Sequence, residues 1–189
     1  MSIKNLKDMI TQQKKEEEKD QGDVFIPEQQ IKEYIELVER LYKLTTDSIA
    51  ELINEGLIQV QREKTRIYEE SVGEYEIDSL FLSINSKKIK FIPAGTMLIG
   101  SKGRVDVFGP FGSEKFMLIR KGVKNPRDLI NVTVSIGSSK ENKEEKERPQ
   151  RLTVDDWEWK TLPSDNRWVK FDDVTSDTIT DLIMRMING

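Results

Sequence analysis

The sequence contains neither cysteine nor histidine. The absence of cysteine excludes disulfides and thiolate chemistry, and the absence of both residues excludes zinc sites of the usual Cys/His type. Catalytic arrangements that pair serine or cysteine with histidine are excluded as well. Any catalysis would depend on carboxylates, Lys, Tyr, Ser or Thr, or on a hard metal ion held by oxygen ligands. We therefore expect a protein that is not an enzyme and that carries no cofactor.

Long apolar runs are also missing. No segment approaches the roughly 18 apolar residues that span a bilayer, and residues 1–13 lack the apolar core of an export signal. We therefore predict a cytoplasmic protein that has no membrane partner. The net charge of -4 argues against a surface that binds nucleic acid throughout, although a local basic patch remains compatible with it.

Charged residues make up 34% of the chain, and much of this charge lies in two segments that are nearly free of apolar residues, 14–23 and 138–150. Such segments bury too little apolar surface to fold by themselves. We therefore predict a charged, flexible N-terminal segment at 1–23. Residues 24–189 are predicted to form a single α+β domain, in which 138–150 is a mobile charged loop.

An amphipathic helix is predicted at the start of this domain. Pro27 suits the first turn of a helix, and apolar residues follow it at helical spacing. They are Ile31, Tyr34, Ile35, Val38, Leu41 and Tyr42. The stripe continues to Gly56, which suits a left-handed C-terminal cap. Thr46 or Asp47 can cap a second helix, so a long helix and a helical hairpin both remain open.

A second amphipathic helix is predicted near the C-terminus. Thr175 or Ser176 is suited to its N-cap, and Asp177 favours its first turn. Its apolar stripe consists of Ile179, Leu182, Ile183 and Met186.

Between the helices the hydrophobic period changes to two, and short β-prone runs alternate with turn residues, which is typical of an antiparallel sheet. The predicted strands are 58–61, 66–69, 80–84, 88–92, 97–99, 104–108, 116–120, 132–136, 157–161 and 168–171. Hairpin connections are predicted at 85–86, 101–103 and 109–113. The order helix, strands, helix indicates an α+β fold with a curved antiparallel sheet of about six to eight strands.

Residues 95–112 contain several glycines, which raises the question of a phosphate-binding loop. A P-loop requires GxxxxGK[ST], and a dinucleotide fingerprint requires a helix after its glycines. The run after Gly103 alternates like a strand, so we interpret Gly103 as the positive-φ residue of a tight hairpin and 109–112 as a wider turn. Lys102 and Arg104 at the hairpin tip are candidates for contact with an anionic partner.

The tryptophans Trp157, Trp159 and Trp168 lie close together in the sequence. Trp157 and Trp159 project from the same face of a strand, where they either fill the core or present an aromatic platform. Tryptophan is also a frequent anchor of protein interfaces. The candidate partner-binding residues are therefore these three tryptophans together with Lys102 and Arg104.

Residues 48–71 comprise a helix that ends in Glu-Gly-Leu-Ile and two β-prone runs around a charged turn. This segment resembles the recognition helix and wing of winged helix-turn-helix proteins. The resemblance implies a DNA-binding regulator in which Arg62, Lys64 and Arg66 on the wing contact nucleic acid. A helix cap followed by a simple hairpin explains the same residues.

Acidic residues gather near the C-terminus. They are Asp155, Asp156, Asp172, Asp173, Asp177 and Asp181. If the strands around the tryptophans pair, these carboxylates can hold Mg²⁺ or Ca²⁺, as in a metal-dependent hydrolase. Solvated strand ends and the N-terminus of a helix explain the same positions, and we assign no metal site.

The favoured function is a non-catalytic protein-interaction module, acting as an accessory or neutralising, inhibitory subunit for a macromolecular partner. An amphipathic helix and clustered aromatic residues supply surfaces for such contacts. An acidic protein of this kind can mask a basic partner, such as a toxin or a nucleic-acid enzyme, by electrostatic complementarity. The expected partner is another protein of undefined identity, and the DNA-binding regulator and the metal-dependent hydrolase are the alternatives.

Overall fold

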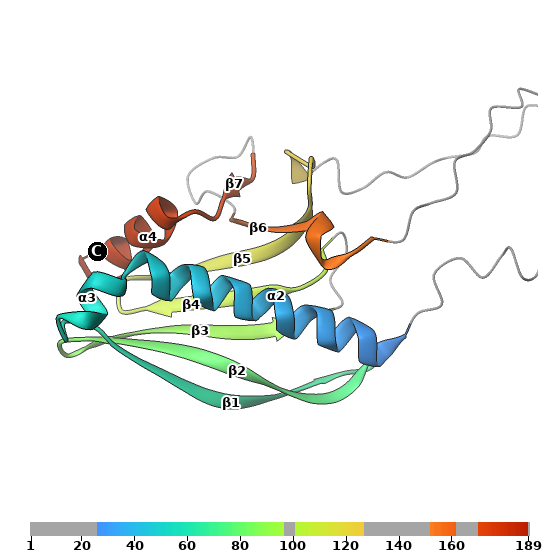
Figure 1. Cartoon of the computed structure of the whole chain (residues 1–189), viewed down its shortest axis with the longest axis horizontal. Coiled ribbons are helices and arrows are strands. Elements are labelled where there is room, and N and C mark those ends of the chain that lie inside the picture. The colour runs from blue at the N-terminus through green and yellow to red at the C-terminus, as the bar shows by residue number, and fades with distance from the viewer. Residues whose placement is uncertain (1–25, 97–100, 127–151, 162–169, 189) are drawn as a thin grey trace, which may run out of the picture. The chain divides into compact units, whose positions relative to one another are not determined.

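The computed structural model describes residues 26–96, 101–126, 152–161 and 170–188. Its helices and strands belong to one compact unit, which comprises Pro27–Ile136 and Thr153–Gly189 (Figure 1). An N-terminal helix, a seven-stranded antiparallel sheet and a C-terminal helix follow one another along the chain. This order confirms the predicted α+β fold. The predicted flexible segment at 1–23 and the predicted loop at 138–150 lie outside the described residues.

The N-terminal helix α2 spans Pro27–Ser48, with Pro27 in its first turn as predicted. Its buried face consists of Tyr34, Leu37, Val38, Leu41, Tyr42 and Thr45. The break before the short helix α3 (Ala50–Asn54) falls at Ile49. A second N-cap at Thr46 or Asp47 is therefore wrong, because both residues belong to α2.

The side chains of the last turns of α2 explain why it continues to Ser48. Thr46 Oγ1 donates a hydrogen bond to the carbonyl of Tyr42 at 3.0 Å, and Asp47 pairs with Lys43 at 2.5 Å. The Lys43–Asp47 pair, at spacing i to i+4, stabilises the helix. The Thr46 hydroxyl is bonded within the helix and therefore does not cap a new one. Gly56 follows α3 with a φ of 76°, which confirms the predicted left-handed cap.

The C-terminal helix α4 spans Ser176–Asn188, and its buried residues are the predicted stripe of Ile179, Leu182, Ile183 and Met186. Thr175 is the N-cap residue, because its Oγ1 accepts a hydrogen bond from the main-chain N–H of Thr178 at 3.3 Å. Asp177 lies in the first turn, where a negative charge is favourable. The predicted start and apolar stripe of this helix are thus confirmed.

The sheet is a meander in which each strand pairs with the next one along the chain. Its strands are β1 (Gln59–Glu69), β2 (Gly73–Ile84), β3 (Lys87–Gly95), β4 (Arg104–Gly109), β5 (Gly112–Arg120), β6 (Trp157–Thr161) and β7 (Asp172–Asp173). The predicted strands at 97–99 and 132–136 lie outside the described residues. Of the predicted strand 168–171, the described residues 170 and 171 precede β7.

The two strands predicted at 58–61 and 66–69 are one continuous strand, β1. Its pairing with β2 is unbroken from Gln59 opposite Ser83 to Glu69 opposite Gly73. The charged residues 62–65, predicted as a turn, therefore lie inside the strand. Arg62 and Lys64 in this run pair with carboxylates of α2 and β2, as described below.

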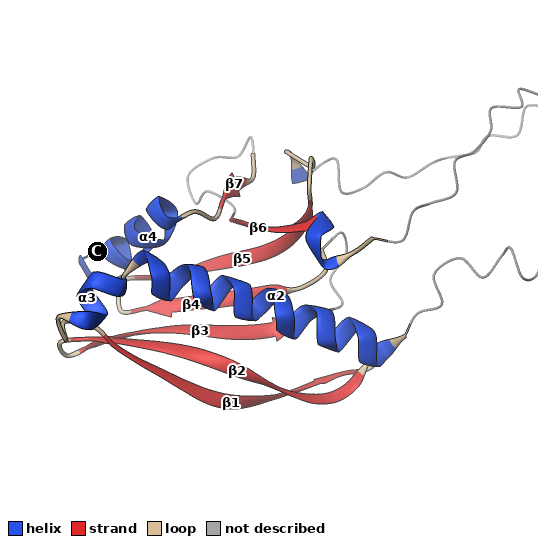
Figure 2. Ribbon diagram, in the orientation of Figure 1, coloured by secondary structure: helices blue, strands red, loops and turns tan. Residues whose placement is uncertain are grey.

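Both helices cover the same face of the sheet (Figure 2). The register aligns Leu80 of β2, Phe91 of β3 and Val107 of β4 on that face, and all three are fully buried. Tyr42 of α2 meets Phe91 edge to face, with the ring centroids 6.5 Å apart. The core therefore lies between the helices and one side of the meander.

The β1–β2 hairpin changes its buried face along its length. Leu80 and Leu82 are buried near β3, whereas Tyr75 and Ile77, on the opposite face of β2, are buried farther out. Because the β1–β2 register contains no shift, strand twist and not a bulge produces this change. The twist gives the sheet its predicted curvature.

The glycine-containing segment 95–112 differs in detail from the prediction. Gly95 in this segment has a positive φ of 131°, whereas the φ of Gly103 is not positive. Residues 101–103 do lie in the connection between β3 and β4, but the predicted tight turn at these residues is wrong. They pair with β5 instead: Lys102 N–H donates to the carbonyl of Leu118, and Leu118 N–H donates to that of Gly103. Lys102 and Gly103 thus both lie opposite the single residue Leu118, which is the pattern of a β-bulge.

Two other predicted connections do form turns. Ile84 pairs with Lys87, so residues 85–86 connect β2 and β3 as predicted. Gly109 pairs with Gly112 between β4 and β5, which leaves a two-residue turn that is tighter than the predicted one. No helix follows the glycines of 101–112, and this described part of the chain does not have the form of a nucleotide-binding loop.

Gly103 is required by close packing. A Cβ atom at this position would lie 2.4 Å from Cε2 of the fully buried Tyr34. We predict that Gly103→Ala lowers the free energy of unfolding by about 1–3 kcal/mol, because the core must shift to accept the methyl group. Urea denaturation measures this loss. Gly122→Asn is the control, since it faces open space at a φ of 87°; an equal loss in both variants would contradict the packing explanation.

Candidate interaction surfaces

Lys102 is held in a largely buried ion pair with α2. Its Nζ atom lies 2.6 Å from Glu33 Oε2, and the two side chains are 8% and 13% exposed. The same atom donates to Gln30 Oε1 at 3.1 Å and lies 5.4 Å from the ring centroid of Trp157. Its charge is thus committed to contacts within the molecule.

Arg104 does not lie beside Lys102, although only one residue separates them. The bulge opposite Leu118 reverses the alternation of the strand, so Lys102 faces α2 and Arg104 faces the uncovered side of the sheet. There Arg104 Nε lies 2.8 Å from Asp106 Oδ1. The structure therefore does not bring the two predicted residues together at a hairpin tip.

The tryptophans of β6 connect this strand to α2. Trp159 Nε1 donates a hydrogen bond to the carbonyl of Leu37 at 2.9 Å. Trp157 and Trp159 lie on the same face of β6, as predicted, and both are half-buried against the core. Of the two alternatives for this pair, the structure therefore shows the one in which the tryptophans pack on the core. Trp168 lies outside the described residues.

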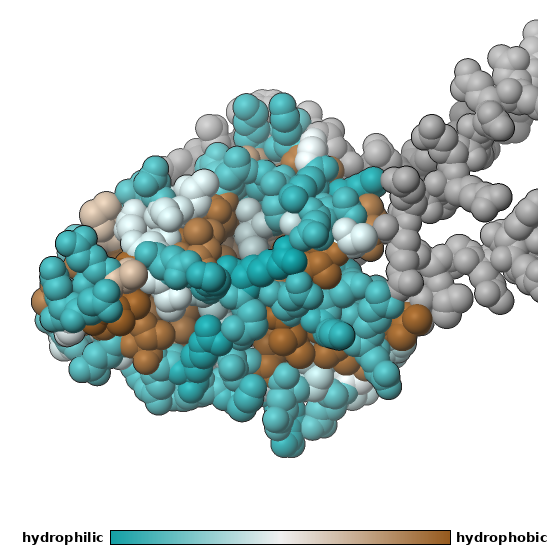
Figure 3. Space-filling view, in the orientation of Figure 1, coloured by the Kyte–Doolittle hydropathy of each residue, from teal (hydrophilic) through white to brown (hydrophobic). Residues whose placement is uncertain are grey.

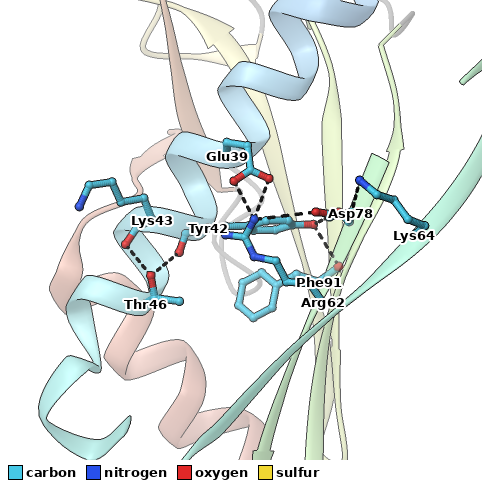
Figure 4. A network of polar contacts seen from close by, with 8 residues as sticks. All are labelled: Glu39, Tyr42, Lys43, Thr46, Arg62, Lys64, Asp78 and Phe91. Carbon is cyan, nitrogen blue, oxygen red and sulfur yellow. Dashed lines mark hydrogen bonds and ion pairs between the residues drawn. The ribbon is translucent and has the colours of Figure 1, made fainter. Parts of the chain in front are cut away.

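The predicted wing residue Arg62 belongs to a polar network between α2 and the β1–β2 hairpin (Figure 4). Arg62 Nη1 lies 2.7 Å from Glu39 Oε2, and Lys64 Nζ lies 2.8 Å from Asp78 Oδ1. Tyr42 Oη donates to the carbonyl of Asp78 at 2.8 Å. Burial raises the pKa of Tyr42, so its hydroxyl remains a donor at all physiological pH values.

The third wing residue, Arg66, is paired as well, with Glu74 at 3.1 Å and Glu76 at 3.4 Å. Arg62, Lys64 and Arg66 thus lie inside a strand and next to carboxylates. A DNA interface needs unneutralised positive charge, which this arrangement does not supply. The five-residue helix α3 before them is also shorter than two turns.

Three of the six C-terminal aspartates have separate structural partners. Asp155 pairs with Arg40 at 2.7 Å, and Asp173 pairs with Lys160. Asp156 accepts hydrogen bonds from the main-chain N–H and the hydroxyl of Thr153, in a capping box. Among the described residues, no group of three or more acidic side chains is arranged to hold a metal ion.

An apolar groove lies between α3, α4 and the turn that joins β2 to β3. Its volume is about 410 Å³. It is lined by Ile49, Leu52, Leu57, Ile58, Ile84, Asn85, Thr180, Ile183, Met184 and Ile187. Figure 3 shows hydrophobic side chains gathered at this end of the molecule, around α3. We call this feature the α3–α4 groove.

Three side chains of the α3–α4 groove are unusually exposed for their type. Leu57 is 57% exposed, Met184 53% and Leu52 39%. Leu57 follows the capping Gly56, at a position that often packs against the preceding helix. Its main-chain N–H does bond to the carbonyl of Leu52 at 2.9 Å, but its side chain remains in solvent.

Exposed carboxylates flank the groove on both helices. Glu51 belongs to α3 and Glu55 is its C-cap, and Asp177 and Asp181 belong to α4. None of them forms an ion pair with another residue in the described parts of the chain. The groove is therefore apolar inside, and these carboxylates lie on or next to its two helices. Lys87 also lies beside it, since its Nζ donates to the carbonyl of the groove-lining Ile187 at 2.5 Å.

No protein-family model, curated protein or solved structure matches this chain. None of the helices in the described ranges is long and apolar enough to cross a membrane. The protein is thus defined by its fold and surfaces, as an α+β protein with a seven-stranded antiparallel meander and helices on one face. Its function has to be inferred from those surfaces.

We predict that the Lys102–Glu33 ion pair stabilises the folded protein. Lys102→Met leaves the Glu33 carboxylate without its cation, and removal of one member of a buried pair costs about 3 kcal/mol of unfolding free energy. The double variant Lys102→Met/Glu33→Gln should recover part of the loss. Lys43→Met is the matched control, because its pair with Asp47 is exposed and contributes less than about 1 kcal/mol. Equal effects at Lys102 and Lys43 in urea denaturation would refute a buried pair.

Asp156 should contribute a pH-dependent part of the stability. The hydrogen bond from the Thr153 N–H lowers the pKa of Asp156 from its ordinary 3.8. Because the folded pKa lies below the unfolded one, the contribution is present above pH 3.8 and is lost as the pH falls further. Asp156→Ala should therefore destabilise the protein at neutral pH and converge with the wild type in acid. Asp172→Ala, at an exposed position, is the control and should change the melting temperature little.

Proposed function

We propose that this protein is a non-catalytic cytoplasmic interaction module that binds a basic amphipathic helix of a partner protein in the α3–α4 groove. It acts as an accessory or inhibitory subunit of that partner. The observation that carries this proposal is the combination of an exposed apolar groove with flanking carboxylates that have no cation partner in the described structure.

The apolar side chains favour a helix as the occupant. Leu52 and Leu57 on one side and Met184 on the other frame a concave apolar strip. A partner helix fills such a groove with residues spaced i, i+3, i+4 and i+7. Burial of a leucine- or methionine-sized side chain contributes about 1.5–3 kcal/mol, so a few contacts suffice for binding. Methionine adapts its shape to different occupants.

The charge around the groove favours a basic partner. Glu51, Glu55 and Asp181 are exposed, and the chain as a whole carries a net charge of -4. Charges at the rim of an interface accelerate association and select against partners of the same sign. A helix with lysines or arginines on either side of its apolar stripe fits both properties of the groove. Masking of such a helix is one way to neutralise a basic protein.

The test uses a designed peptide that forms an amphipathic helix of leucine and lysine, with fluorescence anisotropy as the readout. We expect binding that weakens with salt, and a loss of about tenfold or more in Leu57→Ser/Met184→Ser, because two apolar contacts are removed. Glu51→Gln/Glu55→Gln/Asp181→Asn should weaken binding less and reduce its salt dependence.

Matched controls distinguish binding in the groove from nonspecific binding of the peptide. A peptide with the same leucines but with glutamates in place of the lysines should bind more weakly. Tyr68→Ser removes a side chain that is 75% exposed on β1, outside the groove, and should leave binding unchanged. No binding of the basic peptide, or equal binding by the wild type and the Leu57→Ser/Met184→Ser variant, would overturn the proposal.

A further inference from the structure

A second hollow lies on the face of the sheet that α2 and α4 leave uncovered. Its volume is about 600 Å³. It is lined by Phe81, Lys88, Lys90, Ile92, Phe108, Gly109 and Pro110. The register places Phe81 opposite Lys90, and Lys90 opposite Phe108. Since their neighbours Leu80, Phe91 and Val107 face the core, these side chains face away from the helices.

The strand register makes this a regular arrangement of rings and cations. Phe81, Lys90 and Phe108 form a row across β2, β3 and β4. Because neighbouring strands are about 4.8 Å apart, the two phenylalanines lie about 10 Å from each other, with a lysine between them. Lys88 Nζ lies 5.6 Å from the ring centroid of Phe81. Phe108 is 46% exposed, which leaves its ring accessible.

The positive charge on this face is not neutralised. Within the described residues, Lys88, Lys90 and Lys115 form no ion pair, unlike Arg62, Lys64 and Arg66 on β1. Lys115 on β5 lies opposite Asp106, on the same face. The Asp106 carboxylate is already paired with Arg104 at 2.8 Å. A protein of net charge -4 thus keeps a local basic surface that contains one exposed ring, Phe108, and one half-buried ring, Phe81.

We propose that this uncovered face binds single-stranded nucleic acid. Bases stack on the rings of Phe81 and Phe108, and the lysines contact the phosphates. Proteins bind single strands by the same combination, in which aromatic side chains accept bases and a positively charged surface follows the backbone. An acidic peptide would use the lysines alone. The row that contains both rings, with Phe108 exposed, favours nucleic acid over such a peptide.

This site is independent of the α3–α4 groove, because the two share no lining residue. It also differs from the winged-helix hypothesis in its residues and in its ligand. The sequence signal is weak, since lysines and phenylalanines in alternating strands are ordinary strand residues. Only the register reveals that they form one surface.

Fluorescence anisotropy with a labelled oligothymidylate, and with the RNA strand of the same length, tests the proposal on the full chain. We expect binding at low salt that weakens as potassium chloride is raised. Lys88→Gln/Lys90→Gln should reduce the slope of log affinity against log salt by about 1.4, the value for two single-strand phosphate contacts. Phe108→Ala and Phe108→Leu should both weaken binding about tenfold, because each removes the stacking ring.

The controls identify the chemistry of the site. Lys121→Gln/Lys124→Gln removes the same charge at other exposed positions, and Tyr68→Ala removes an exposed ring on β1; both should bind like the wild type. Absence of binding at low salt would overturn the proposal. An equal loss of affinity in the control variants would overturn it as well. It would also be overturned if polyglutamate displaced the labelled strand as effectively as unlabelled oligonucleotide and Phe108→Leu had no effect on binding. Leu57→Ser/Met184→Ser should bind nucleic acid normally, which separates this site from the groove.

Discussion

The packing of α2 on the sheet through two buried tyrosines is the contact on which the rest of the structure depends. Tyr34 Oη donates to the carbonyl of Arg104 at 2.5 Å, and Tyr42 Oη donates to that of Asp78. Each hydroxyl thereby satisfies a main-chain carbonyl beneath the helix, where water is excluded. Burial raises the pKa of both tyrosines, so both stay neutral donors. Gly103 leaves the space in which the Tyr34 ring lies.

Coverage of one face by α2 determines how the charges of the sheet are distributed. On the covered side, cations are drawn into pairs with the helix, as Lys102 is with Glu33 and Arg62 is with Glu39. On the other side no described helix supplies carboxylates, and Lys88 and Lys90 remain available. Two surfaces of opposite charge therefore arise in one small protein: an acidic apolar groove and a basic aromatic hollow.

These two surfaces suggest a connection between the proposed activities. A protein that holds a basic helix in one groove and a single strand on another face can act on a partner that itself binds nucleic acid. The two proposals nevertheless rest on different residues. The sheet positions both surfaces, because α3 and α4 meet the β2–β3 turn at one end and β2, β3 and β4 present the other.

The sequence by itself determined the helices and the class of fold. The apolar stripes of α2 and α4, Pro27, the cap at Gly56 and the turn at 85–86 were all predicted, because each follows from local spacing or backbone preference. The length of β1 was not, because charged residues continue as strand only when α2 and β2 supply their partners. The second N-cap in α2 was wrong for a similar reason, since Thr46 and Asp47 found partners within the helix.

The surfaces, by contrast, were decided by the tertiary structure alone. Lys102 and Arg104 are near neighbours in the sequence, but the bulge opposite Leu118 turns them to opposite faces. Phe81, Lys90 and Phe108 are far apart in the sequence, and the strand register aligns them in one row. The exposure of Leu57 depends on how α3 and α4 meet. Periodicity predicts which residues face a common side, but only pairing between strands and packing of helices decide which side is covered.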